Sequence, residues 1–301
     1  MRKIAILTSA DMMLGGAELR PDYFELEEQM AKLTPAFAAL GLKAELMLWN
    51  DAVRRAHEFE AMLPLFVWDY CLGDNAALFL TAMEQASENT RIFNPLSILK
   101  INSNKAYLEV LGERGAPIIP SLITEHMTPE FANKAYAHFG CDTIVAKPQV
   151  GAGAWRQALL KRGEAYPQPE DLPPGRAIVQ PFLPSVLSEG EHSFLYFDGA
   201  FSHAVNKRPK AGDYRIQSSY GGSELPYAPS AEEQELGASI LALLDEMPLY
   251  ARVDLLRGLD GKLKLIELEM IEPYLYMPFA RGQGGENEGA RKLASALAAR
   301  L

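Results

Sequence analysis

Short apolar runs alternate with segments of helical periodicity along the first ninety-odd residues. The predicted order is strand, helix, strand, strand, helix and strand, over residues 3–9, 23–41, 43–49, 63–70, 75–89 and 91–94. Gly41 gives the first helix a natural end, because glycine readily takes the left-handed conformation that closes a helix. Strands that alternate with helices favour an α/β unit with a mostly parallel sheet.

The middle of the chain continues with predicted helices and strands. One helix is expected from about Ser103 to about Gly115, with Lys105 on it. A second helix starts at Thr128, which is a good N-cap residue, with Pro129 in its first turn. The predicted strands of this region are 117–123, 143–148, 155–161 and 177–183.

The pattern changes in the second half of the chain, where alternation is interrupted by Asp-Gly pairs. Residues 192–205 alternate around Asp198-Gly199, and residues 250–270 alternate around Asp260-Gly261; both are hairpin signals. A last helix is expected over 288–301. The predicted fold is therefore α/β, with an antiparallel α+β character in the C-terminal half.

Composition narrows the class of protein. The 301 residues suffice for two or three compact units, and 48% hydrophobic with 23% charged residues is ordinary for a soluble globular protein. A net charge of −10 argues against a nucleic-acid-binding surface or a polybasic membrane patch. The apolar run at 4–7 is too short for a signal peptide or a membrane span, and two cysteines without CxxC spacing suit a reducing compartment. We expect a cytoplasmic protein with no membrane or nucleic-acid partner.

The segment 144–155 (IVAKPQVGAGAW) places Lys147 at the end of a strand and small residues directly after it. Gly151 and Gly153 would let backbone N–H groups approach an anion. The order differs from a P-loop, in which the lysine follows the glycines, and from the dinucleotide fingerprint. Neither known phosphate-binding pattern is present, so the residues alone leave the role of this segment open.

Three carboxylates are expected to meet on the second predicted hairpin. Glu267 and Glu269 are two residues apart, so both face the same side of the sheet, and Asp254 lies on the partner strand. Carboxylates that converge repel one another unless a cation lies between them, and Mg²⁺ prefers oxygen ligands. The sequence therefore indicates a magnesium site.

These features together resemble the ATP-grasp ligases, in the branch of glutathione synthetase-like proteins and the O-ureidoserine cyclo-ligase. The resemblance runs from about Trp68 to the end and rests on VAKPQVGAGA, IVQPFL, SHAVNKRPKAGDYRIQSSYGG and YARVDLL…LKLIELEMIEP. It implies an ATP-grasp fold preceded by an N-terminal α/β domain. The expected boundaries are 1–97 for that domain, 98–185 for the central subdomain with the mobile flap, and 186–301 for the C-terminal subdomain.

The resemblance also implies roles for residues around the nucleotide. Lys147 and Lys105 would contact the phosphates of ATP, and Gly151 and Gly153 would lie in the flap that closes over them. Gln180 would contact adenine through its side chain. The backbones of Phe182 and Leu183 would read the purine edge. Glu191 would hold the ribose, with Glu189 as a competing candidate.

Further residues would act where the chemistry takes place. The resemblance implies that Lys207 and Arg215 approach the γ-phosphate and the acyl phosphate, and that Arg252 stabilises the tetrahedral intermediate. Two Mg²⁺ ions, with Mn²⁺ as a substitute, would be held by Asp254, Glu267 and Glu269. Glu269 departs from the family, which often has asparagine at this position; metal binding is expected to survive.

The implied activity is ligation of a small carboxylic acid to an amine or related nucleophile, through an acyl phosphate with release of ADP. A kinase that leaves the γ-phosphate on its product and a non-catalytic nucleotide-binding regulator are the alternatives. Substrate choice is expected from 9–23 and 281–289, and a homodimer is common in proteins of this type. Trp68 is either a substrate contact or core, and His203 either lies near the site or is packed.

Overall fold

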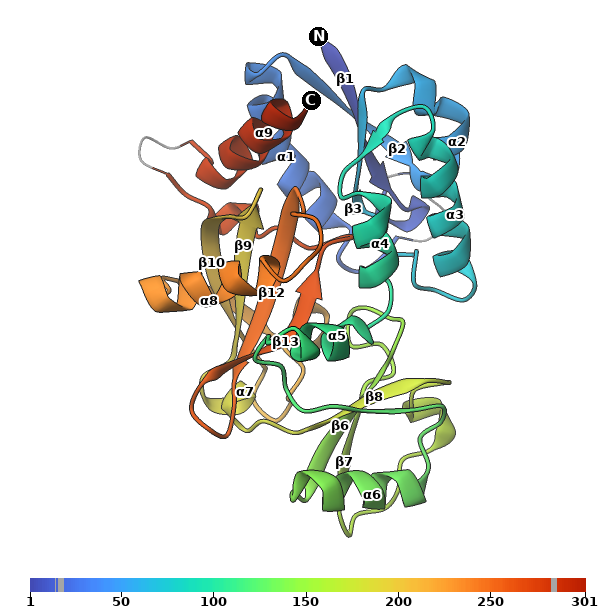
Figure 1. Ribbon diagram of the computed structural model, residues 1–301, viewed down its shortest axis with the longest axis vertical. Coiled ribbons are helices and arrows are strands. Elements are labelled where there is room, and N and C mark those ends of the chain that lie inside the picture. The colour runs from blue at the N-terminus through green and yellow to red at the C-terminus, as the bar shows by residue number, and fades with distance from the viewer. Residues whose placement is uncertain (14, 16–18, 283–285) are drawn as a thin grey trace.

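Three β-sheets organise the chain, which a computed structural model describes over residues 1–13, 15, 19–282 and 286–301. Figure 1 shows the N-terminal region at one end, the central region at the other, and the C-terminal sheet between them. The mixture of a parallel sheet with two antiparallel sheets confirms the predicted fold class. The expected boundaries at 97/98 and 185/186 stay a prediction. Among the described residues, no helix is long and apolar enough to cross a membrane.

The N-terminal sheet is fully parallel and has the order β2-β1-β3-β4. Its strands are β1 (Arg2–Thr8), β2 (Leu42–Leu48), β3 (Ala61–Phe66) and β4 (Arg91–Ile92), and its helices are α1 (Phe24–Ala39), α2 (Ala52–Arg55) and α3 (Asn75–Ser87). Ile4 and Ile6 pack into one apolar cluster with Phe37, whereas Ala5 and Leu7 pack into another with Phe79. Both faces of the sheet are therefore covered, as an all-parallel sheet requires.

The central sheet is antiparallel, with the order β5-β8-β6-β7. It consists of β5 (Leu122–Thr124), β6 (Thr143–Pro148), β7 (Ala158–Lys161) and β8 (Ala177–Pro181), and α6 (Pro129–Phe139) covers it. The Thr128 hydroxyl accepts a hydrogen bond from Phe131 N at 3.1 Å, which confirms the predicted N-cap. Residues 149–157 connect β6 to β7 and form the predicted flap segment.

The C-terminal sheet is also antiparallel, with the order β11-β10-β9-β12-β13. Its strands are β9 (Glu191–Phe197), β10 (Ala200–Arg208), β11 (Ser223–Tyr227), β12 (Tyr250–Arg257) and β13 (Leu263–Glu269), accompanied by α7 (Ser185–Ser188) and α8 (Ala231–Leu241). Both predicted hairpins form. Asp198 and Gly199 take positive φ angles of 50° and 76°, which the tight β9–β10 turn needs.

The last helix, α9 (Glu288–Arg300), returns to the N-terminal region and packs beside α1 (Figure 1). Asn94, buried after β4, joins the same region to the C-terminal sheet. Its amide group donates to Tyr250 O and Met270 O at 2.8 Å each, and its Oδ1 accepts from Leu249 N at 2.6 Å. These contacts fix the N-terminal sheet against the strands that carry the candidate metal ligands.

Several sequence-based boundaries were wrong. The helix expected from Ser103 to Gly115 is reduced to α5 (Tyr107–Glu113). A helix that the sequence did not predict, α4 (Leu96–Asn102), precedes it, so Lys105 lies in the turn between the two. The strand expected over 63–70 ends at Phe66, and the chain turns away over 67–70. The strand expected over 117–123 is reduced to β5 and an isolated bridge between Ile118 and Leu265.

Candidate active site

A cleft of about 300 Å³ lies where the three sheets approach one another. Its wall includes all fourteen residues that the sequence proposed for the site: Lys105, Lys147, Gly151, Gly153, Gln180, Phe182, Leu183, Glu191, Lys207, Arg215, Arg252, Asp254, Glu267 and Glu269. They come from β6, β8, β9, β10, β12, β13 and the connecting loops. Segments far apart in the sequence thus form one continuous surface.

The two lysines of the proposed phosphate site have different surroundings. Lys105 Nζ lies 2.8 Å from Glu267 Oε1 and donates to Gly151 O at 2.5 Å, so it links β13 to the flap. Within the described residues, no carboxylate oxygen lies within 4.0 Å of the Lys147 ammonium. Burial lowers the pKa of Lys147, because it disfavours the charged form. Lys147 is therefore a cation without a close counter-ion that faces the cleft.

The flap after Lys147 has a backbone that suits small residues. Gly153 has φ 61°, Ala154 φ 56° and Arg156 φ 51°, all in the left-handed region. Trp155 is 46% exposed and lines the cleft. The loop therefore presents both backbone groups and an aromatic ring to whatever the cleft holds.

The segment expected to read adenine is partly engaged by the protein itself. Phe182 N donates to Thr143 O at 3.0 Å, so a purine contact by the Phe182 backbone would have to use its carbonyl oxygen. Gln180 Nε2 donates to Ser121 Oγ at 3.0 Å. In the described part of the chain, Leu183 N has no backbone partner and remains able to donate. Val145 and Leu256 supply apolar wall on the same side.

The two acids proposed for the ribose differ in position. Glu191, the first residue of β9, is buried, lines the cleft and forms an ion pair with Lys207. Glu189 is bound outside the cleft wall by His192 at 3.0 Å and Arg257 at 2.7 Å. The geometry favours Glu191 for a ligand contact.

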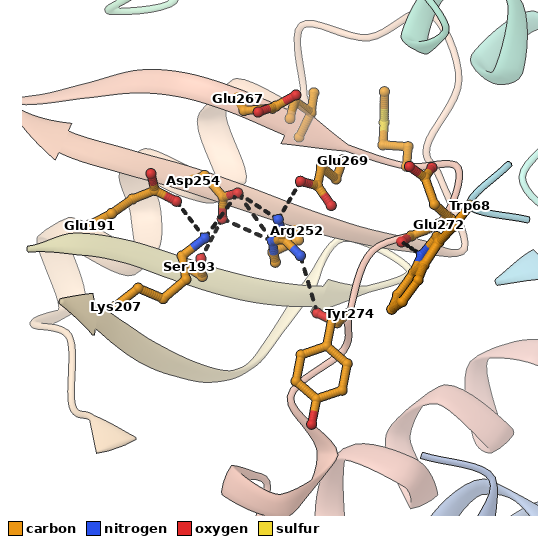
Figure 2. Close-up of polar contacts among 12 residues, drawn as sticks. Trp68, Glu191, Ser193, Lys207, Arg252, Asp254, Glu267, Glu269, Glu272 and Tyr274 are labelled. Carbon is orange, nitrogen blue, oxygen red and sulfur yellow. Dashed lines mark hydrogen bonds and ion pairs between the residues drawn. The ribbon is translucent and has the colours of Figure 1, made fainter. Parts of the chain in front are cut away.

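One face of the C-terminal sheet carries a row of charges. Lys207 lies opposite Glu191 on one neighbouring strand and opposite Glu224 on the other. Asp254 pairs with Glu267 across β12 and β13. Opposite residues share a face of the sheet, so this register brings the charged side chains together. Figure 2 shows Asp254 and Glu191 turned toward Lys207.

Arg252 forms ion pairs with two of the candidate metal ligands. Its Nε lies 3.0 Å from Asp254 Oδ1, and its Nη2 donates to Glu269 (Figure 2). Asp254 also accepts from Ser193 Oγ. Among the described residues, no three histidine, cysteine or acidic side chains are grouped closely enough to form a ready-made metal site. The carboxylates instead pair with basic side chains.

The electrostatic balance of this face nevertheless leaves carboxylates in excess. Burial raises the pKa of Glu269 to about 8 despite the neighbouring Arg252, and burial raises the pKa of Glu272 to about 7. Burial opposes ionisation of Asp254 too, but Arg252 and Lys207 hold its pKa at about 2. Hard oxygen donors with such unfavourable mutual charge suit a divalent cation, which would favour their ionised forms. The residues therefore fit Mg²⁺.

The guanidinium group of Arg215 is engaged by two neighbouring side chains. It forms two-pronged contacts with Asp213, including Nη2 to Oδ2 at 2.7 Å, and its guanidinium lies 3.8 Å from the Tyr220 ring centroid. Arg215 still lines the cleft, so a phosphate could compete with Asp213 for its remaining donors.

The cleft wall also contains residues whose role the sequence left open and residues that it did not single out. Trp68 lines the cleft, donates Nε1–H to Glu272 O at 2.9 Å and carries Arg20 at 4.9 Å from its ring centroid. Of the segments expected to select substrate, 9–23 contributes Arg20 and Asp22, whereas the described part of 281–289 does not line the cleft and 283–285 lie outside the described residues. The lining residues that the sequence did not single out include Glu25, Glu224, Glu272, Tyr274 and Tyr276.

His203 is packed rather than placed at the site. One ring nitrogen lies 2.8 Å from Leu275 O and the other 2.9 Å from Ser202 Oγ, and His203 is not part of the cleft wall. Burial lowers its pKa to about 4, so the imidazole is neutral at pH 7.

Comparison with known proteins agrees with this geometry. Residues 4–94 match the family described as the N-terminal domain of D-cycloserine synthetase DcsG. The chain is 28% identical over 295 residues to the cycloserine biosynthesis protein DcsG of Streptomyces lavendulae, covering 92% of this chain and 95% of that protein. The crystal structure of D-cycloserine synthetase DcsG superposes with a TM-score of 0.82 at 26% identity, covering 99% of both chains.

A more distant solved structure shares the fold. D-alanine–D-alanine ligase from Bacillus anthracis, complexed with ATP, superposes with a TM-score of 0.66 at 12% identity, covering 100% of this chain and 98% of that one. The full-length match to DcsG, the shared fold and the assembled cleft agree with the resemblance drawn from the sequence. Together these findings support an ATP-grasp ligase, an enzyme that uses ATP to form a C–N bond.

Proposed function

We propose that this chain joins a small amino-acid-like carboxylic acid to an amine or related nucleophile through an acyl phosphate. The observation that carries the proposal is the pairing, in one cleft, of the uncompensated Lys147 with the acidic face of β12 and β13. A triphosphate would give the Lys147 ammonium group a counter-ion, since no carboxylate oxygen of the described residues lies within 4.0 Å of it. The relatives named for cycloserine synthesis and D-alanine–D-alanine ligation support a small substrate with a reactive carboxylate.

ATP would bind with its purine against Val145 and Leu256, within reach of Leu183 N–H, and with its ribose at Glu191. Lys147 and Lys105 would hold the α- and β-phosphates, because ammonium groups form strong charge-assisted hydrogen bonds to phosphate oxygens. The flap would close over them and exclude water that would otherwise hydrolyse the activated acid.

Asp254, Glu267 and Glu269 would hold Mg²⁺, for which we propose two ions, with Mn²⁺ able to replace them. Bound there, the metal would neutralise charge on the phosphate oxygens. Arg252 lies against the same carboxylates and is buried, so its guanidinium is in place to stabilise negative charge near the transferred phosphate.

The proposed reaction has two steps. A carboxylate oxygen of the acid attacks the γ-phosphorus, the bond to the β,γ-bridging oxygen breaks, and ADP leaves. The amine nitrogen then attacks the acyl carbon, and the C–O bond to phosphate breaks with release of inorganic phosphate and a proton. Arg252 would stabilise the oxyanion of the tetrahedral intermediate between attack and release, with Lys207 and Arg215 near the phosphate.

Phosphorus NMR of the purified protein with ATP, Mg²⁺ and pooled acids and amines tests the proposal. ADP with free phosphate, formed only when both pools are present, is the expected result. Phosphate retained on an organic product would make the chain a kinase. Nucleotide binding without ATP consumption in any pool would favour a regulatory protein.

A homodimer and a cytoplasmic location also remain part of the proposal. Light scattering after size-exclusion chromatography would measure the first, and fractionation of the producing cells would measure the second.

A further inference from the structure

A strained tyrosine lies on the cleft wall in the segment that follows β13. Tyr276 has φ 48° and ψ 38°, in the left-handed region that a bulky side chain disfavours. Strain of this kind persists only where the surrounding structure holds it, and it is common at binding and catalytic sites. The side chain of Tyr276 lines the cleft and is 5% exposed. The strained backbone therefore places a buried aromatic ring at the cleft wall.

The backbone around Tyr276 is fixed by side chains from two other elements. Gln29 of α1 accepts a hydrogen bond from Leu275 N at 2.7 Å, and a ring nitrogen of His203, on β10, lies 2.8 Å from Leu275 O. On the other side, Phe279 N donates to Tyr276 O at 2.9 Å. The segment is thus held to both the first helix and the C-terminal sheet, and this gives the Tyr276 ring a defined position in the cleft wall.

The hydroxyl of Tyr276 has no partner within the protein. Among the described residues, no group forms a hydrogen bond with its Oη, although buried phenols usually find one. The neighbouring Tyr274, by contrast, donates from its Oη to Glu28 at 2.6 Å. Burial raises the pKa of the Tyr276 phenol, so the group keeps its proton at neutral pH. It is therefore a neutral hydrogen-bond donor that a ligand in the cleft can use.

The surroundings of this phenol favour an anionic partner. Arg252 Cζ lies 5.7 Å from the centre of the Tyr276 ring, within the range of a cation–π contact. The same guanidinium group pairs with Asp254 and Glu269, two of the candidate metal ligands. After burial, Lys207 and then Arg252 have the largest influence on the pKa of the phenol. Tyr276 thus lies beside the two cations that the proposed function assigns to the phosphate and the acyl group.

We propose that Tyr276 is a catalytic residue whose hydroxyl donates a hydrogen bond to the acyl oxygen of the activated acid. This inference rests on the proposed ligase function and adds a residue to it. When the amine nitrogen attacks the acyl carbon, the carbonyl electron pair moves onto this oxygen. The pair returns when the C–O bond to phosphate breaks. The phenol keeps its proton throughout, and its hydrogen bond is strongest while the oxygen is negatively charged.

Tyr276→Phe removes the hydroxyl and keeps the ring against Arg252. Single D- and L-amino acids and small hydroxy acids are screened with ATP, Mg²⁺ and hydroxylamine, and the acid that forms hydroxamate fastest is used for all variants. With acid and ATP saturating, kcat/KM for hydroxylamine reports on attack at the acyl carbon. We expect it to fall by about 10- to 100-fold in Tyr276→Phe, the range for a lost hydrogen bond to a charged group.

A second measurement follows the step before attack. ATP with heavy oxygen in the β,γ-bridge loses this label from the bridge when the acyl phosphate forms and reverts in the absence of hydroxylamine. Tyr276→Phe should keep this exchange rate within about threefold of wild type, because the oxyanion forms only after the acyl phosphate. The exchange also shows that the variant still assembles a working nucleotide site.

Tyr196→Phe is the matched control. Tyr196 is buried in β9 and donates from its Oη to Gln234 O at 2.6 Å, but it is not part of the cleft wall. Its kcat/KM for hydroxylamine should stay within about twofold of wild type. Tyr276→Phe breaks no internal hydrogen bond, whereas Tyr196→Phe breaks one, so the Tm of Tyr276→Phe should be the higher of the two.

The outcomes separate this inference from the proposed function. An unchanged kcat/KM for hydroxylamine in Tyr276→Phe, or an equal loss of attack and of isotope exchange, would overturn the role of Tyr276 and leave the ligase function standing. Hydroxamate from no acid with the wild-type protein would count against the ligase function and this inference together. A loss confined to the attack step, and absent from Tyr196→Phe, would support the inference.

Discussion

Removal of the Lys147 charge is the sharpest test of the nucleotide site. Lys147→Met keeps the length and apolar contacts of the side chain and removes only the ammonium group. Since no carboxylate oxygen of the described residues lies within 4.0 Å of that group, the change breaks no internal ion pair. The loss should therefore fall on the ligand.

The magnitude follows from the position of Lys147 in the cleft. Two unit charges 4 Å apart at an effective dielectric constant of about 20 interact by roughly 4 kcal/mol. Part of this is offset because burial already disfavours the charged lysine, as its lowered pKa indicates. A net loss of about 2 to 3 kcal/mol corresponds to a roughly 30- to 150-fold weaker Kd for a non-hydrolysable ATP analogue.

Isothermal titration calorimetry with the analogue and Mg²⁺ measures this change directly. Lys161→Met is the matched control, because Lys161 lies at the exposed end of β7 in the same sheet and pairs with Glu164 at 3.3 Å. Its Kd should stay within about twofold of wild type. A Kd for Lys147→Met within threefold of wild type would refute the assignment of Lys147 to the phosphates.

Three further predictions concern the metal, pH and stability. Glu267→Gln should fold normally and lose Mg²⁺-dependent ADP formation; a rate within a few-fold of wild type across a MgCl₂ titration would remove Glu267 from the metal site. Burial lowers the pKa of His203 to about 4 in the folded protein, below its value in the unfolded chain. As the pH falls from about 6.5 to about 4, the unfolded chain therefore binds a proton that the folded protein does not. The free energy of unfolding should drop by up to about 3 kcal/mol over this range. Urea unfolding across that range should show this drop as the difference between wild type and His203→Gln, and identical slopes would contradict it. Asn94→Ala should cost about 3 kcal/mol in the same assay, because it leaves the buried backbone groups Leu249 N, Tyr250 O and Met270 O without this partner; a loss below 1 kcal/mol would contradict the role of Asn94.

The hairpins were predictable because their information is local. An Asp-Gly pair between alternating runs specifies a tight turn, and the two-residue period then places Glu267 and Glu269 on one face. The break before α5 was missed although its signal is also local. Asn104 accepts a hydrogen bond from Ala106 N at 2.9 Å, a turn that asparagine favours, whereas the sequence prediction started the helix near Ser103 and so included this turn in it.

Two acidic residues of the cleft wall, Glu25 and Glu224, could not be predicted in the same way. Glu25 sits in a helix whose pattern indicates only one buried face, and nothing near it in sequence supplies Glu224. Their approach depends on how α1 and β11 pack around the C-terminal sheet, which is a property of the assembled chain. That Glu224 lies on the charged face of the C-terminal sheet became evident only from the pairing of β10 with β11, which places it opposite Lys207. Long-range packing, rather than local preference, therefore brings these two carboxyl groups to the cleft wall.

The ion pairs within the cleft bear on how nucleotide and metal would bind together. Lys105, Lys207 and Arg252 are each neutralised by carboxylates that are also the proposed ligands of Mg²⁺ or ribose. A triphosphate alone would draw these cations away and leave buried carboxylates uncompensated, and a divalent ion alone would displace the cations without giving them a partner. When both bind, the basic side chains pair with the phosphates and the carboxylates pair with the metal, so no buried charge is left unpaired. We therefore expect ATP and Mg²⁺ to bind cooperatively, each raising the affinity for the other by the same factor.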